Sequence, residues 1–261
     1  MKLAVISDIH GNLVTLEAVL ADMRGRGVDS IVCLGDVIAT GPRPVECLET
    51  VKGLACPVIL GNTDERFISG GKGFGKAGGK EVHMLEKMFE WTSSKLSSSH
   101  LKFMETFKPT LSIDLPGGSS LLCYHGSPRS NRELITSSTP EEKMHEIFSG
   151  EENHQLYAGG HSHAQMLRTH GSSVIFNPGS VGLPFVKLSD GRAVNIPRGE
   201  YAVVEADTNG VRIEFCRVNV DVKKIMDDGL SSGLPYSDVW ASDWGAPEGI
   251  TKTDKKTNNG M

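Results

Sequence analysis

The sequence predicts an α/β fold with a parallel sheet and crossover helices. In the first sixty residues, short apolar runs at 3–6, 31–34 and 58–60 alternate with stretches of helical periodicity. This alternation is typical of parallel strands joined by crossover helices. Each run is followed within a few residues by a polar side chain beside a glycine. Ligands bind at the carboxyl ends of the strands in such sheets, so we expect a functional site there.

The first helix is expected to begin after Asn12, because asparagine caps helix N-termini. Apolar residues then recur at helical spacing, namely Leu13, Leu16, Val19, Leu20 and Met23. Gly25 and Gly27 are expected to end this helix. A second helix is expected over 44–52, between the second and third apolar runs.

Residues 65–108 interrupt the alternation and predict a small helical insertion on the sheet. Within the insertion, 70–80 contains six glycines and three lysines, a composition typical of a flexible segment. Helices are expected over 81–91 and 95–107. Two roles are open for 70–80: a lysine-bearing flap that orders over bound substrate, or a solvated linker into the helices.

The rest of the chain predicts further strands and one helix. Strands are expected at 111–115, 120–124, 156–158, 174–176, 202–205 and 211–218, with a helix over 140–148. The last two strands flank Asn209-Gly210, a favoured hairpin turn. We therefore predict a single domain over 1–246, followed by a disordered polar tail over 247–261.

Composition and charge exclude several classes of protein. The chain has 27 basic and 32 acidic residues and a net charge of -5, so no basic surface indicates nucleic-acid binding. Its five cysteines are scattered and odd in number, which favours reduced thiols in a cytosol. No apolar run approaches the roughly 20 residues that span a bilayer, and the polar cluster from Ser7 argues against a signal peptide. We expect a cytoplasmic protein without a membrane partner.

Seven side chains of metal-binding type follow the ends of five apolar runs. They are Asp8, His10, Asp36, Asn62, His125, His161 and His163. Strands hold side chains placed just past their ends in fixed positions. Each fragment alone is common in proteins without a metal site, and an Asp-x-His pair is more often a helix cap. Together, and with alternate histidines in Gly160-His161-Ser162-His163, they indicate one shared metal centre.

This order of motifs resembles that of the calcineurin-like metallophosphoesterase superfamily, in particular its small prokaryotic phosphodiesterase branch. The resemblance extends from residue 1 to about residue 218 and includes 177–180, Asn-Pro-Gly-Ser, which is similar to a signature of that branch. It implies an α/β-β/α sandwich of two sheets, with helices outside and the site at one edge.

The resemblance also implies two metal ions, each held by three side chains and bridged by the Asp36 carboxylate. The first set is Asp8, His10 and His163, and the second is Asn62, His125 and His161. Carboxylate, imidazole and amide ligands suit divalent transition metals. We expect manganese, with iron, nickel or zinc as alternatives. Such a pair, about 3.5–4 Å apart, supports in-line displacement at phosphorus by a bridging water or hydroxide. The expected catalytic residues are Asp36, Asn62, Asp64 and His125.

Position 63 departs from the pattern of many relatives, which have a histidine there that protonates the leaving group. This chain has Thr63, whose hydroxyl does not titrate near neutral pH. Members of the small phosphodiesterase branch also lack the histidine. Thr63 therefore indicates the class of substrate, and it disfavours efficient hydrolysis of unactivated monoesters. For the neighbouring Asp64, two roles are open: orienting Asn62 or acting on a water, and capping a helix of the insertion.

The function predicted from these residues is that of a phosphodiesterase or pyrophosphohydrolase on small or nucleotide-like substrates. A Ser/Thr protein phosphatase is one alternative, against which Thr63 and the short insertion weigh. A non-catalytic metal-binding scaffold, like the retromer subunit that shares this fold, is another. The seven filled ligand positions weigh against a scaffold. Arg129 is expected either to contact a substrate phosphate or to form a surface salt bridge, and the sequence is compatible with a homo-oligomer.

Overall fold

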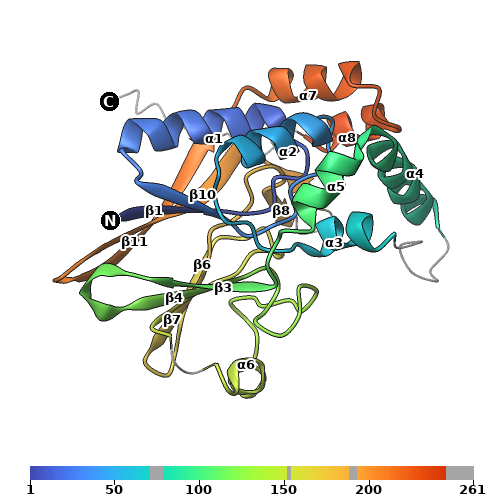
Figure 1. Ribbon diagram of the computed structural model, residues 1–261. Coiled ribbons are helices and arrows are strands. Elements are labelled where there is room, and N and C mark those ends of the chain that lie inside the picture. The colour runs from blue at the N-terminus through green and yellow to red at the C-terminus, as the bar shows by residue number, and fades with distance from the viewer. Residues whose placement is uncertain (71–78, 152–153, 188–192, 245–261) are drawn as a thin grey trace, which may run out of the picture.

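Two β-sheets face each other and helices cover their outer faces (Figure 1). The computed structural model describes residues 1–70, 79–151, 154–187 and 193–244. Helices α1 (Leu13–Arg26) and α2 (Pro44–Gly53) pack on the first sheet, and α6 (Glu141–Phe148) packs on the second. The α/β-β/α sandwich expected from the sequence is confirmed.

The first sheet has the strand order β11 (Gly210–Asn219), β10 (Arg198–Asp207), β1 (Lys2–Ile6) and β2 (Ser30–Cys33). Strands β1 and β2 are parallel and α1 connects them, as expected for a crossover unit. The other two pairs are antiparallel, and β10 and β11 form the predicted hairpin. The parallel pair therefore brings the chain segments after β1 and β2 to the same edge.

The second sheet repeats this arrangement. Its order is β3 (Thr110–Asp114), β4 (Ser120–Tyr124), β5 (Leu156–Ala158), β7 (Ser173–Asn177) and β6 (Met166–His170). Strands β4, β5 and β7 are parallel, whereas β3 and β6 pair antiparallel at the two edges. The short 3-10 turn Pro116–Gly118 links β3 to β4, which form the predicted hairpin.

Alternation along the strands explains the layers, because successive side chains of a strand point to opposite faces. In β1, Leu3 and Val5 belong to the apolar cluster between the sheets, whereas Ala4 and Ile6 contact the cluster beneath α1 and α2. Strand β4 divides in the same way between the inter-sheet cluster and the one beneath α6. Both faces are buried, which accounts for the continuous apolar runs in the sequence.

The first helix begins as predicted, since the Asn12 side chain accepts a hydrogen bond from the Thr15 N–H. Gly27 ends it in the left-handed conformation, whereas Gly25 lies inside the helix and does not end it. The strand predicted at 58–60 is wrong. Val58 and Ile59 make only isolated β-bridges. Strand β2 ends at Cys33, so it offers this segment no further residues with which to form a ladder.

The predicted insertion contains α3 (Asn62–Ser69), α4 (Lys80–Lys95) and α5 (Ser98–Met104). Helix α3 was not predicted, and α5 is shorter than the helix expected over 95–107, because Ser97 caps its N-terminus in a capping box with His100. Phe67 and Met104 belong to the same apolar cluster as α1, so the described part of the insertion shares the main core.

Several elements had no clear signal in the sequence. They are β6, the hairpin of β8 (Phe185–Lys187) and β9 (Ala193–Asn195), α7 (Val222–Ser231) and α8 (Ser237–Ser242). Most of the proposed flap at 70–80 and the proposed tail at 247–261 lie outside the described residues, and the single domain over 1–246 stays a prediction. Where the structure is described, every helix is too short or too polar to cross a membrane.

Candidate metal centre

The seven side chains of metal-binding type come together at one edge of the sandwich. Ile6 and Cys33 are paired in register at the ends of β1 and β2, and Cys123 and Ala158 are paired in β4 and β5. Backbone hydrogen bonds continue this pairing into the loops, from Asp8 N–H to the Gly35 carbonyl (2.9 Å) and from Gly160 N–H to the His125 carbonyl (2.7 Å). The loops that carry the site are therefore fixed by the sheets.

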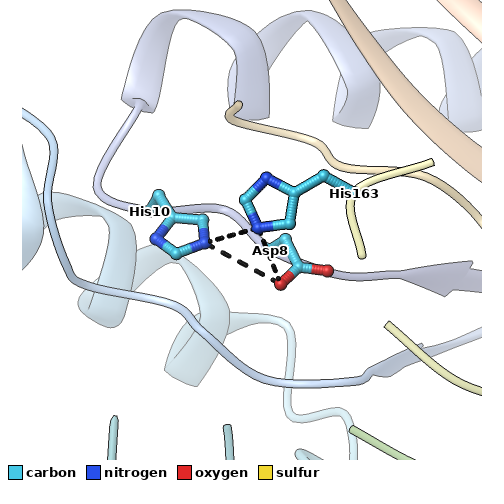
Figure 2. Close-up of side chains that lie close together, drawn as sticks. All are labelled: Asp8, His10 and His163. Carbon is cyan, nitrogen blue, oxygen red and sulfur yellow. Dashed lines mark hydrogen bonds and ion pairs between the residues drawn. The ribbon is translucent and has the colours of Figure 1, made fainter. Parts of the chain in front are cut away.

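Asp8, His10 and His163 form a first ligand group (Figure 2). Its two histidine Nε2 atoms are 3.1 Å apart, and Asp8 Oδ1 lies 3.3 Å from His163 Nε2 and 3.8 Å from His10 Nε2. Asp8 Oδ1 is buried and has no hydrogen-bond partner among the described residues. A buried carboxylate oxygen without a partner is costly unless a cation neutralises it.

Asn62, His125 and His161 form a second ligand group. Asn62 Oδ1 lies 3.0 Å from His125 Nε2. His125 and His161 also lie within metal-binding reach of Asp36, with all three ligand atoms within 4.8 Å of one another. Asn62 is the first residue of α3, so the extended segment before it places its side chain in the site even though that segment is not a strand.

Asp36 lies between the two groups. Its Oδ2 is 3.6 Å from His10 Nε2 in the first group and 3.5 Å from His125 Nε2 in the second. Ligand bonds of about 2.0–2.2 Å around one tetrahedral metal put neighbouring ligand atoms roughly 3.3–3.6 Å apart. The distances to Asp36 therefore suit a carboxylate oxygen that reaches two metal ions at once.

Three of the histidines are oriented by backbone carbonyls. Nδ1 of His125 donates to Leu34 O (2.8 Å), Nδ1 of His163 donates to Leu183 O (2.9 Å), and Nδ1 of His10 donates to the Ala39 carbonyl. This leaves each Nε2 directed into the centre. Metal-binding histidines characteristically donate their other ring N–H in this way. The residues present therefore fit a pair of transition-metal ions.

The backbone at the site is unusual as well. Asp8, His10, Asp36, His161 and His163 all have positive φ, between 49° and 65°. Residues other than glycine rarely adopt this left-handed conformation. Such residues cluster at functional sites, where the surrounding structure must hold them. Here the backbone hydrogen bonds that continue the strand pairing into the loops hold these residues in place.

The first turn of α3 and the loop after β2 clamp each other. The Thr63 N–H donates to Asp36 Oδ1 (2.9 Å), while the Asp64 carboxylate accepts from the Val37 N–H (3.0 Å to Oδ1). The first pair satisfies a free N–H of the helix end and leaves Asp36 Oδ2 for the centre. Asp64 is fully buried. This geometry supports a positioning role for Asp64 rather than direct action on a water.

Gly61 makes this clamp possible. A Cβ at this position would lie 2.2 Å from both the backbone nitrogen and Oδ1 of Asp36. We therefore expect Gly61→Ala to destabilise the protein by about 1–3 kcal/mol and to weaken metal binding. Gly25→Ala is the matched control, because Gly25 lies in the last turn of α1, where a Cβ meets nothing within 4 Å, and helical alanine is favoured. Denaturant unfolding and metal titration of both variants test this, and equal behaviour would contradict it.

The Asn-Pro-Gly-Ser segment supports the histidine loop. The Asn177 amide donates to the Gly160 carbonyl (2.6 Å), and the Ser180 hydroxyl donates to the Asp8 carbonyl (2.7 Å). A Cβ at Gly182 would lie 1.7 Å from the Ile9 carbonyl oxygen, so the two loops pack backbone to backbone. In the sequence, this segment is recognisable only as a signature. Its positioning role depends on contacts with residues 17 and 172 positions away in the chain.

Opposite charges dominate the titration of the metal-free centre. Burial opposes ionisation of Asp36, but His125 and His10 outweigh it and hold its pKa well below the usual range. Burial likewise opposes charging of His125, but Asp36 outweighs it and raises the pKa of His125 to about 9. Burial and the Asp36 charge together raise the pKa of Asp64. In the absence of metal, His125 is therefore an imidazolium at neutral pH.

Metal binding is expected to expel this proton. Nε2 of His125 cannot bind a metal while protonated, so metal affinity should rise with pH up to about 9. The His125–Asp36 pair should stabilise the metal-free fold most between about pH 4 and 6.5. This contribution should be lost as the pH rises through 9, and also at low pH where Asp36, whose pKa is lowered, becomes protonated. Calorimetric metal titration at pH 7.5, in two buffers of different ionisation enthalpy, measures the released protons. A pH-independent metal affinity without proton release would contradict the expectation.

The arginines near the site are engaged in ion pairs. Arg129 bonds to Glu133 (2.8 Å) and Glu146 (3.1 Å). Of the two roles expected for Arg129, a phosphate contact or a surface salt bridge, the structure therefore has the salt bridge. Arg132 pairs with Glu65 and approaches the Asn62 carbonyl (3.4 Å). Arg132, to which the sequence assigned no role, therefore lies beside Asn62 of the second ligand group.

The fold and the centre together define an α/β sandwich protein with a cluster of histidine and aspartate residues suited to divalent metals. Residues 1–209 match the calcineurin-like phosphoesterase superfamily domain. The chain belongs to this superfamily, as its motifs indicated.

Two solved structures and one further protein are similar to this chain. A metallophosphoesterase from Sphaerobacter thermophilus has 28% sequence identity and a TM-score of 0.71, with coverage of 93% of this chain and 98% of that one. A hypothetical protein from Pyrococcus horikoshii has 20% identity and a TM-score of 0.73, with coverage of 92% and 96%. An uncharacterised protein of Methanocaldococcus jannaschii is 29% identical, over 89% of this chain and 93% of its own length.

Proposed function

We propose that this protein is a dinuclear metal-dependent phosphodiesterase or pyrophosphohydrolase acting on small or nucleotide-like substrates. The observation that carries the proposal is the position of Asp36 Oδ2, 3.6 Å from His10 Nε2 and 3.5 Å from His125 Nε2. One carboxylate oxygen in reach of two ligand groups is the arrangement that a bridged metal pair requires.

When bound, the two metals would supply an activated water and neutralise charge on the phosphate. The first ligand group would hold one ion and the second would hold the other. Asp8 and Asp36 are the only carboxylates among the seven side chains, so two divalent ions would leave the centre positively charged. An overall acidic protein could then attract a phosphate ester locally. Asp64 would act by holding the Asp36 loop through the Val37 N–H.

Different features separate the alternatives from the proposal. The carbonyl bonds that hold the Nδ1 atoms of His125 and His163 would serve a metal-binding scaffold equally well, so turnover is what separates a scaffold from an enzyme. A Ser/Thr protein phosphatase is disfavoured by Thr63, which offers no group that titrates near neutral pH. The proposal includes manganese as the first candidate metal, with iron, nickel or zinc as alternatives, and a cytoplasmic location.

Turnover of bis(4-nitrophenyl) phosphate with added Mn²⁺ tests the proposal. We expect 4-nitrophenolate release by the metal-loaded protein, loss of release after chelation, and recovery when Mn²⁺ is returned. Absence of turnover in protein that binds two metals per chain would favour the scaffold. Equal or greater turnover of a phosphoserine peptide would favour the protein phosphatase.

A further inference from the structure

A pocket of about 470 Å³ lies beside the metal centre. His161 and His163, one from each ligand group, form part of its wall. The rest of the wall includes Leu134 from the segment between β4 and α6, Met166 at the start of β6, and Phe185 and Lys187 of β8. Pockets of about 300–1,000 Å³ hold small-molecule ligands. Because His161 and His163 belong both to the pocket wall and to the candidate metal centre, a group bound in this pocket would lie next to that centre.

The pocket presents large apolar side chains next to a charged centre. Leu134 is 54% exposed, one of the few large apolar side chains so exposed in the described part of the chain. The Phe185 ring lies 6.1 Å from the His163 ring, at an interplanar angle of 57°. Met166 adds a polarisable thioether, which contacts aromatic rings favourably. Leu134, Met166 and Phe185 therefore give the pocket an apolar wall beside the two histidines.

The charge of the lining narrows the class of ligand. None of the described residues that line the pocket is acidic, and Lys187 is its one lysine or arginine. The described part of the lining therefore suits an uncharged group with a neighbouring anion, and it offers no carboxylate for a cationic group. Flat rings gain most from aromatic and thioether neighbours because they stack or meet them edge to face.

We propose that this pocket binds an uncharged aromatic group that is attached to an ester oxygen of the substrate phosphate, as a nucleobase is through its sugar. The inference rests on the proposed function, since it places the phosphate at the metal centre. It narrows that function from phosphate esters in general to esters with an aromatic substituent. Phe185 and Leu134 are then specificity-determining residues that do not touch the reacting phosphorus.

Binding of two non-hydrolysable probes tests this without requiring turnover. Calorimetric titration of the Mn²⁺-loaded protein with phenylphosphonate and methylphosphonate should give at least about tenfold tighter binding of the phenyl compound. Phe185→Ala and Leu134→Ala should each weaken phenylphosphonate binding by about three- to tenfold and leave methylphosphonate binding unchanged. Leu167→Ala is the matched control. Leu167 follows Met166 on β6, is 51% exposed and does not line the pocket.

Equal affinities of the two phosphonates for the wild-type protein would overturn the inference, and so would failure of both to bind. Phenyl selectivity that survives in Phe185→Ala and Leu134→Ala would also overturn it. The proposed function fails separately. If bis(4-nitrophenyl) phosphate is not hydrolysed but the phenyl preference depends on Phe185 and Leu134, the pocket assignment stands and the hydrolase proposal falls.

Discussion

Asp36→Asn should lower phosphodiesterase activity by on the order of 10²–10³-fold or more. It should also weaken the binding of both metal ions together. The amide has one oxygen, and the Thr63 N–H already requires an acceptor at Oδ1. The NH₂ group would then replace Oδ2, which faces both ligand groups. A donor without negative charge at this position repels two cations. Turnover assays and metal analysis after dialysis measure the two effects.

Asp114→Asn is the control for this experiment, because it makes the same chemical change away from the centre. Asp114 is exposed at the end of β3. It should retain wild-type activity and metal content. Normal turnover by Asp36→Asn, with two metals still bound per chain, would contradict the bridging role. Loss of one metal alone would assign Asp36 to a single ligand group.

The second large effect concerns the leaving group. Hydrolysis of an activated diester should exceed that of an alkyl monoester, with a penalty on the order of 10²–10⁴-fold for poor leaving groups. The physical reason is the absence of a proton donor at position 63. The Thr63 hydroxyl oxygen is buried and has no hydrogen-bond partner among the described residues, and the Thr63 N–H is bonded to Asp36. Rates across a series of esters of increasing leaving-group pKa measure the penalty.

Two substitutions distinguish the effect of the Thr63 hydroxyl from the effect of lacking a general acid at this position. Thr63→Val removes the hydroxyl at nearly constant volume and should leave the leaving-group dependence unchanged. Thr63→His introduces an acid that titrates near neutral pH and should narrow the gap between good and poor leaving groups. Equal rates across the whole series in the wild-type protein would show that another group protonates the leaving oxygen.

The sequence allowed the ligand residues to be proposed because each follows a recognisable apolar run, which is a strand in every case except the run before Asn62. The apolar runs of β1, β2, β4 and β5 are continuous, since both faces are buried, and glycines border the turns. Asn12 likewise predicted the start of α1 through its capping chemistry. Such signals are local in the chain, so no knowledge of the packing was needed.

The supporting contacts were not predictable in this way. The carbonyls of Leu34 and Leu183 that orient the histidines are backbone atoms, which any residue type offers. The reciprocal bonds of Thr63 and Asp64 depend on how α3 docks against the loop after β2. The pocket wall joins Leu134 to Phe185, two apolar residues whose types indicate only burial until the fold places them together. Long-range packing therefore forms the pocket proposed to set specificity, while local signals pointed to the candidate metal ligands.

An anomalous-scattering crystal structure of the Mn²⁺-loaded protein would show directly whether Asp36 bridges two metal ions. We expect two anomalous peaks about 3.5–4 Å apart, one at the first ligand group and one at the second, with Asp36 Oδ2 bound to both. A single peak at full occupancy of the site would contradict it. Two peaks with Asp36 bound to only one ion would contradict it equally.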